Sequence, residues 1–92
     1  MIRSFKHKGL QEFFDTGSKV GIQAKHAARI AEQLFALNRA TKPKDMDFPS
    51  WVLHPLLGNL KGHWSVRVSG NWRMTFRFIG TDAEVVDYQD YH

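Results

Sequence analysis

Apolar and polar residues alternate along the C-terminal third of the chain. On both sides of Gly70-Asn71, every second residue is apolar, and the positions between them hold serine, threonine and three arginines. Such alternation predicts strands with one buried and one exposed face, and Gly70-Asn71 is typical of a hairpin turn. We therefore predict three successive strands, over residues 63–69, 71–79 and 83–88, followed by a tail.

The middle of the chain shows helical spacing instead. Apolar residues recur there three and four positions apart, which predicts an amphipathic helix over residues 22–40. Several basic residues occupy its other positions, and they suit either a nucleic-acid surface or, more commonly, a solvated face. The expected buried stripe consists of Ala27, Ile30, Ala31, Leu34 and Leu37.

A shorter apolar pattern precedes this helix. Leu10, Phe13 and Phe14 are spaced as one face of a short helix that Gly17 would end, and we expect all three in the core. Residues 2–5 are predicted to form a short first strand.

Two segments without periodicity are predicted to be loops. Residues 41–49 contain two prolines, and residues 53–62 contain a proline and two glycines. Phe48 and Trp51 are expected to return to the core. The proline after His54 favours an extended backbone there, and a histidine fixed in this way can serve as an acid/base group or only as a structural residue.

The 92 residues are predicted to form one domain, 1–92, because this length supports a single modest core. The formal charge of +4 favours polyanionic partners, with nucleic acid first. The absence of cysteine excludes disulfides and thiolate chemistry. No apolar segment is long enough to cross a membrane, so we expect a cytoplasmic protein without a membrane partner.

Strand parity sorts the side chains of the predicted hairpin between its two faces. The large apolar residues fall on one face, and Arg67, Arg73 and Arg77 fall on the other. Guanidinium groups match phosphate oxygens in pairs, so this second face suits an RNA or DNA backbone. The alternative is that the arginines form cross-strand ion pairs with Glu84 or Asp87.

Several segments of the chain resemble one protein family. Residues 1–10, 53–56, 64–76 and 87–92 are similar to the HigB toxins of bacterial toxin–antitoxin systems, which belong to the RelE/ParE superfamily. The run WSVRVSGNWRMTF and the terminal Asp-Tyr-His are the most specific parts of this match. The resemblance implies an α+β domain with the RelE-like fold, in which two N-terminal helices pack on one face of a small, mainly antiparallel sheet.

The resemblance also implies an activity. It implies an endoribonuclease that cuts mRNA in the ribosomal A site without a metal or other cofactor. The implied partners are the ribosome, a HigA-type antitoxin with a helix-turn-helix domain, and operator DNA only through the antitoxin complex. The matching catalytic positions are His54, Arg73, Asp90, Tyr91 and His92. The expected RNA or phosphate contacts are Lys61, Arg67 and Arg77.

These residue types fit metal-independent cleavage of RNA. A base takes the proton of the 2′-OH, a cation stabilises the charged phosphorane, and an acid protonates the departing 5′-oxygen. His54 and His92 can supply base and acid in either order, and Arg73 can supply the positive charge. Asp90 can orient a histidine or act as the base itself. Tyr91 offers a ring on which a nucleobase can stack.

One position departs from the family pattern. Many relatives carry a lysine where this chain has Leu57, and Lys61, four residues further on, is the candidate replacement. The missing cation favours a weaker toxin or an altered codon preference, and it keeps open a module that binds RNA without cutting it. A metal-dependent nuclease and a gyrase inhibitor also remain open, although the histidines lack the compact spacing of metal ligands and a gyrase inhibitor would not need the Asp-Tyr-His end.

Overall fold

The computed structural model describes residues 1–91, and His92 lies outside the described residues. Its α-helices are α1 (Lys8–Thr16) and α2 (Ala27–Arg39). Its strands are β1 (His54–Pro55), β2 (Trp64–Ser69), β3 (Trp72–Ile79) and β4 (Asp82–Asp90). Short 3₁₀ segments are η1 (Ala24–His26), η2 (Pro43–Met46) and η3 (Gly58–Leu60).

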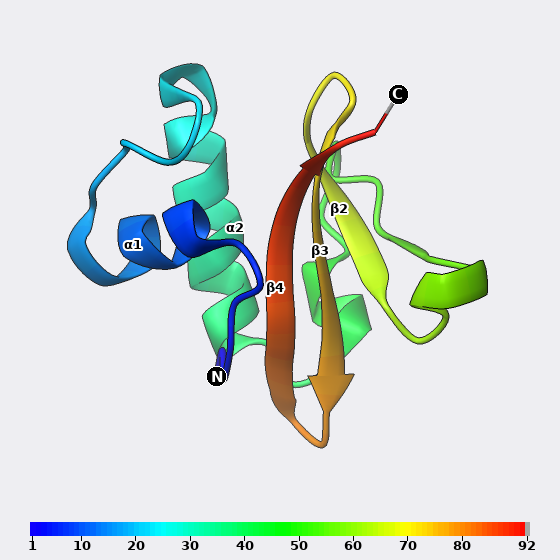
Figure 1. Cartoon of the computed structure of the whole chain (residues 1–92). Coiled ribbons are helices and arrows are strands. Elements are labelled where there is room, and N and C mark those ends of the chain that lie inside the picture. The colour runs from blue at the N-terminus through cyan, green and yellow to red at the C-terminus, as the bar shows by residue number, and fades with distance from the viewer. Residues whose placement is uncertain (92) are drawn as a thin grey trace.

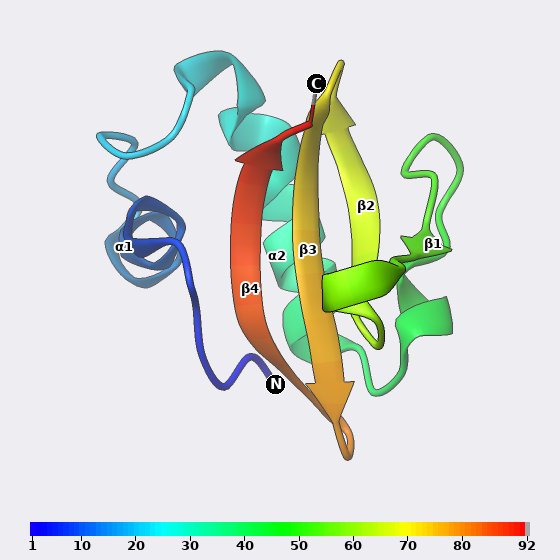
Figure 2. The same cartoon turned by 45° about the vertical axis from the view of Figure 1, so that its right-hand side comes forward.

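The strands form one antiparallel sheet in the order β1-β2-β3-β4. The helices α1 and α2 lie on one side of this sheet, and η3 lies on the other side (Figure 1 and Figure 2). We call the side away from α1 and α2 the open face. The predicted α+β fold is therefore confirmed, with two helices on one face of an antiparallel sheet.

The N-terminal segment runs beside β4 in the parallel direction. It forms isolated bridges between Ile2 and Ala83 and between Phe5 and Val86. The expected first strand thus reaches the edge of the sheet, but it does not become a regular strand.

The core lies between the helices and the sheet, on the apolar side that strand parity predicts. The helix α1 is fixed at both ends, because the His7 side chain accepts a hydrogen bond from the N–H of Leu10 and Gly17 adopts a left-handed backbone (φ 82°). The fully buried side chains contributed by α1, α2 and the sheet include Leu10, Ile30, Leu37, Met74 and Phe76.

The helix α2 buries four of the five residues of the predicted stripe, all except Ala31. Ala31 faces water, whereas Gln33 is 0% exposed. Successive residues turn by about 100°, so the buried stripe centred between Ile30 and Leu37 includes position 33 and leaves position 31 at its rim. The helix also begins at Ala27, later than predicted, because η1 precedes it.

Two aromatic residues expected in the core are on its rim. The side chain of Phe14 is 37% exposed and that of Phe48 is 46% exposed. Each packs on one neighbouring ring, Phe5 at 5.5 Å and Trp51 at 4.6 Å between ring centroids, and leaves its other side open. Trp51 itself is buried, as expected.

Candidate functional site

The register of the sheet brings one residue from each strand into a row on the open face. His54 of β1 pairs with Ser65 of β2. Ser65 pairs in turn with Thr75 of β3, which pairs with Asp87 of β4. Paired residues point to the same face of a sheet, so these side chains are neighbours. The segment 53–62, predicted as a loop, contributes to this row because β1 joins the edge of β2.

His54 has a polar partner at each ring nitrogen, while its side chain stays exposed. Its Nδ1 lies 3.0 Å from the carbonyl oxygen of Pro55, and its Nε2 lies 3.4 Å from the Oγ of Ser65. Because a carbonyl oxygen only accepts hydrogen bonds, Nδ1 carries the proton of the neutral ring. Nε2 is then the basic nitrogen, and it is directed toward β2 on the open face.

The next row of the open face holds two arginines directly opposite each other, Arg67 on β2 and Arg73 on β3. Within residues 1–91, no ion pair joins either guanidinium to a carboxylate. Nη1 of Arg73 donates instead to the carbonyl oxygens of Gly70 and Trp72, at 3.0 and 3.4 Å. Like charges in this arrangement repel, so the pair favours an anion at this end of the sheet.

Arg77, the third arginine of this face, is neutralised. Its Nε donates to Oε2 of Glu84 at 2.6 Å, across the β3–β4 ladder. The alternative of cross-strand ion pairing therefore holds for Arg77, but within residues 1–91 it does not hold for Arg67 or Arg73.

The open face is less solvated than strand parity alone indicates. Ser65 and Thr75 lie on this polar side, yet their side chains are 0% and 2% exposed. Both are small residues among larger neighbours, and η3 lies over this side of the sheet (Figure 2). Nε2 of Gln89 donates to Oγ1 of Thr75 at 3.4 Å and to Oδ2 of Asp87 at 2.8 Å. Two buried hydroxyls and the half-buried amide of Gln89 thus form a polar floor below the exposed His54 and Arg67 and the half-buried Arg73.

Asp90 occupies the other side of the sheet. It is the last residue of β4 and pairs with Trp72, whose ring stacks on that of Tyr88 at 4.5 Å on the helix side. Alternation along the strand places Asp90 on the side of Tyr88. The structure therefore does not bring the Asp90 position onto the face that carries Arg73.

The residues after β4 are described only in part. Tyr91 is half-buried, and its N–H donates to the carbonyl oxygen of Asn71 at 2.8 Å, which extends the pairing beyond the end of β4. The expected catalytic residue His92 lies outside the described residues. The roles of both residues stay predictions.

The position at which the resemblance leads us to expect a lysine stands just before η3. Leu57 precedes its first residue and is 85% exposed, and Lys61, also exposed, follows its last residue. A single 3₁₀ turn therefore separates the apolar residue from the cation expected to replace the lysine.

A second histidine, His26, lies on the helix side and is 3% exposed. Its Nδ1 is 2.6 Å from the phenol oxygen of Tyr88, and the rings of Trp72 and His7 pack against the Tyr88 ring. Burial, and then the charge of Lys25, lowers the pKa of His26, while burial chiefly raises the pKa of Tyr88. Both shifts favour the uncharged forms, so this hydrogen bond joins a neutral imidazole to a protonated phenol.

Gln33 is a buried polar residue that the sequence patterns did not single out. Its Nε2 donates to the main-chain carbonyl oxygen of Arg67 at 2.8 Å, which ties α2 to β2 next to the arginine row. A polar residue within a helix's apolar stripe is the signal that could have found it.

Residues 1–91 contain neither a metal site nor a membrane-spanning helix. Among them, no three His, Asp or Glu side chains are grouped so that they could hold a metal ion. No helix within the same residues has the length and apolar character needed to cross a membrane.

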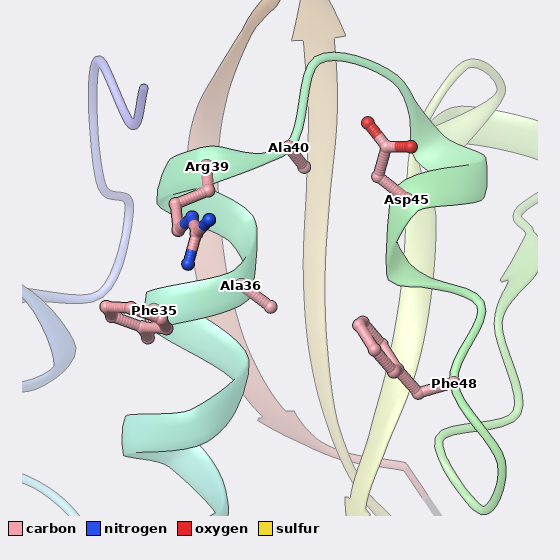
Figure 3. A pocket seen from close by; sticks show the side chains of 6 residues that line it. All are labelled: Phe35, Ala36, Arg39, Ala40, Asp45 and Phe48. Atoms are coloured by element: carbon pink, nitrogen blue, oxygen red, sulfur yellow. The ribbon is translucent and has the colours of Figure 1, made fainter.

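An apolar hollow of about 400 Å³ lies between α2 and η2, away from the open face. Figure 3 shows the ring of Phe48 facing α2 across this hollow. The guanidinium of Arg39 lies 5.3 Å from the centroid of the Phe35 ring. The lining residues of the hollow are Phe35, Ala36, Arg39, Ala40, Asp45 and Phe48.

The sequence matches a known family over almost its whole length. Residues 3–92 match the family described as RelE-like toxin of type II toxin–antitoxin system HigB. The chain is also 45% identical to Endoribonuclease HigB of Proteus vulgaris over 92 residues, which covers 100% of both chains.

Proposed function

The chain belongs to the family of HigB-like, RelE-like toxins of type II toxin–antitoxin systems, and from this premise we propose that it is an endoribonuclease that inhibits translation and growth. In this proposal its substrate is mRNA in the ribosomal A site. A HigA-type helix-turn-helix antitoxin neutralises it and links the complex to operator DNA. The protein acts in the cytoplasm, where it meets translating ribosomes.

The observation that carries the proposal is the arrangement on the open face. His54 presents its basic Nε2 one row away from Arg67 and Arg73, whose charges no carboxylate within residues 1–91 neutralises. Two interstrand spacings, about 10 Å, separate the strand of His54 from that of Arg73. A phosphodiester between them is within reach of both side chains.

The proposed reaction needs no group beyond these side chains and the RNA. Nε2 of His54 takes the proton of the 2′-OH, and the 2′-oxygen attacks the adjacent phosphorus. Arg73, assisted by Arg67, stabilises the negative charge of the phosphorane. The bond to the 5′-oxygen breaks as an acid protonates it, leaving a 2′,3′-cyclic phosphate and a 5′-hydroxyl. His92 supplies this proton, or exchanges roles with His54.

The remaining candidates have supporting roles in the proposal. Tyr91 stacks on a nucleobase. Asp90, on the helix side of the sheet, orients a histidine of the tail instead of contacting the phosphate. Lys61 supplies a cation from the end of η3, and Arg77 remains bound to Glu84.

The test is to map the 5′ ends of cellular mRNA after brief induction of the protein. Cuts inside reading frames, at a fixed position within codons and with 5′-hydroxyl ends, are the expected result. Intact mRNA together with altered DNA supercoiling would instead indicate a gyrase inhibitor. Cleavage on programmed ribosomes should persist in EDTA when magnesium is adjusted to keep the ribosomes intact, and loss of cutting would indicate a metal-dependent nuclease.

A second function, RNA binding without cutting, is favoured by Leu57. This apolar residue is 85% exposed at the position where many relatives carry a lysine. The same mapping with the Leu57→Lys variant separates the two functions. A large gain in cutting indicates an attenuated nuclease, and intact mRNA with both proteins indicates a binder.

A further inference from the structure

A polar cavity of about 230 Å³ opens at the part of the β2 edge that β1 does not cover. It lies between α2, the turn before β1 and the end of the β2–β3 hairpin. Two arginines and two serines from different elements are among its lining residues, and their side chains carry hydrogen-bond donors. Its lining residues are Arg29, Ser50, Arg67, Val68, Ser69 and Gly70.

Neither arginine of this cavity is neutralised within the described residues. The ion pairs found in residues 1–91 use the carboxylates of Asp82 and Glu84, and none of them reaches Arg29 or Arg67. Among residues 1–91, no acidic residue lines the cavity. Two positive charges with adjacent hydroxyl donors and no carboxylate favour a bound anion.

Two hydrogen bonds fix the backbone of Arg67 relative to α2 and to the turn before β1. The main-chain N–H of Arg67 donates to the carbonyl oxygen of Trp51 at 2.6 Å, and its carbonyl oxygen accepts from Gln33 at 2.8 Å. Gln33 is 0% exposed and lies one helical turn after Arg29 on the same side of α2. The bond from Gln33 to Arg67 therefore also holds Arg29 near Arg67.

We propose that this cavity binds a phosphate group of an RNA backbone beside the cleavage site. Arg67 connects the two places, because it lines the cavity and lies opposite Arg73 on the open face. A polyanion that crosses Arg73 meets Arg67 and then Arg29. The lining residues that carry guanidinium and hydroxyl groups come from α2, from the turn before β1 and from β2, and such a set of donors suits the several oxygens of a tetrahedral phosphate.

The inference rests on the proposed function for the position of the RNA, so binding has to be measured apart from cleavage. One probe is single-stranded RNA with 2′-O-methyl sugars, which lacks the attacking hydroxyl. The other is empty ribosomes, which offer ribosomal RNA without a message. Arg29→Gln should weaken binding to one probe about tenfold. For the single-stranded probe, the slope of log affinity against log salt should shrink by about 0.7. Weaker binding to the single-stranded probe would identify a single-stranded RNA such as the message as the source of the phosphate, and weaker binding to empty ribosomes would identify ribosomal RNA.

Arg39→Gln is the matched control. It removes the same charge from the same helix, but Arg39 lies over Phe35 in the hollow of Figure 3. This variant should bind both probes as the unchanged protein does. Ser50→Gly is a second variant, because it removes a hydroxyl of the cavity at a position with φ 72°, which glycine adopts readily. It should weaken binding about threefold.

Equal losses in Arg29→Gln and Arg39→Gln, or no loss in either, would overturn the cavity proposal. Absence of binding to both probes by the unchanged protein would do the same. The proposal would also be overturned if Arg29→Gln bound RNA normally but lost binding to the antitoxin. Arg29 also borders the apolar surface near Phe48, so that result would assign Arg29 to a protein interface. If in-frame cutting is observed together with any of these outcomes, the proposed nuclease function stands and only the cavity proposal fails. If binding depends on Arg29 but no cutting is observed, the nuclease function fails and the cavity proposal stands.

Discussion

His26 on the helix side of the sheet and His54 on its open face differ in burial, in hydrogen-bond partners and in the chemistry open to them. His26 is 3% exposed, and its Nδ1 is bonded to the hydroxyl of Tyr88. His54 is exposed, and its Nε2 is directed at the small hydroxyl of Ser65. Burial lowers the pKa of His26, so its ring stays neutral where an ordinary histidine would begin to titrate.

The difference comes from the neighbours of each ring, because the residue type is the same. On the helix side, the rings of Trp72 and Tyr88 exclude water and leave one hydrogen bond to satisfy the imidazole. On the open face, His54 lies among hydroxyls and next to arginines without carboxylate partners in residues 1–91. One histidine is a neutral part of the core, and the other has the exposed position that the proposed proton transfer requires.

The largest expected effect comes from removing the proton acceptor on the open face. Glutamine keeps a polar side chain at position 54 but cannot take a proton, so His54→Gln should slow mRNA cleavage on programmed ribosomes by about a hundredfold or more. Because His54 is exposed, the free energy of unfolding should change by less than about 0.5 kcal/mol. Single-turnover cleavage and urea denaturation measure the two quantities.

His26→Gln is the counterpart on the helix side. It disturbs a buried hydrogen bond to Tyr88, so it should lower the free energy of unfolding by about 1–3 kcal/mol. The protein that remains folded should still cleave. Undiminished cleavage by folded His54→Gln protein would contradict the catalytic assignment, and a stable but inactive His26→Gln protein would contradict the division between the two faces.

Much of this division could be predicted from the sequence. Alternation on both sides of the hairpin turn separated the apolar side chains from Arg67 and Arg73, and the register confirms that separation. His54 was accessible to prediction because it stands before a proline and within a segment that resembles a known family. The contact of His26 with Tyr88 joins residues 62 apart in the chain, and local periodicity carries no information about such a pair.

The features that escaped prediction depend on tertiary packing. Ser65 and Thr75 are buried on the polar side because they are small residues among larger neighbours and η3 lies over this side of the sheet (Figure 2). Gln33 is buried because its amide bonds to a main-chain carbonyl of β2. The predicted strand ended at residue 88, but β4 continues to Asp90, which pairs with Trp72. Alternation along β4 then places Asp90 on the helix side.

A smaller effect should appear in the pH dependence of stability. Because the pKa of His26 is lowered from 6.5 by folding, the unfolded chain binds more protons than the folded one as the pH falls below that value. The contribution to the free energy of unfolding is therefore fully present above about pH 6.5 and decreases below it. One proton accounts for at most about 1.4 kcal/mol per pH unit. Urea unfolding between about pH 5 and 8 measures it.

The two histidine variants identify the source of this slope. His26→Gln should remove it, and His54→Gln should keep it. Asp45 and Asp82, whose pKa values are lowered from 3.8, lose their contributions at more acidic pH and do not interfere. If the free energy of unfolding of His26→Gln still falls as the pH is lowered, another group causes the pH dependence. The lowered pKa of His26 would then no longer distinguish the two faces energetically.

The smallest expected effect concerns Arg77, the arginine of the open face whose charge Glu84 neutralises. The side chains of Arg77 and Glu84 are 49% and 18% exposed, so Glu84→Gln should cost less than about 1 kcal/mol of stability. It leaves Arg77 without its partner on the face of Arg73. If uncompensated charge on this face attracts RNA, the variant should bind 2′-O-methyl RNA more tightly, with a salt slope larger by about 0.7.

Asp82→Asn is the control for this variant, because it changes the net charge equally while freeing Arg3 and the N-terminal amine at the edge of the sheet. The two variants should differ in RNA affinity, since Arg77 lies on the open face and Arg3 belongs to the segment beside β4. An equal gain in both would show that net charge alone draws RNA to the protein. The placement of arginines on the open face would then no longer explain where RNA binds.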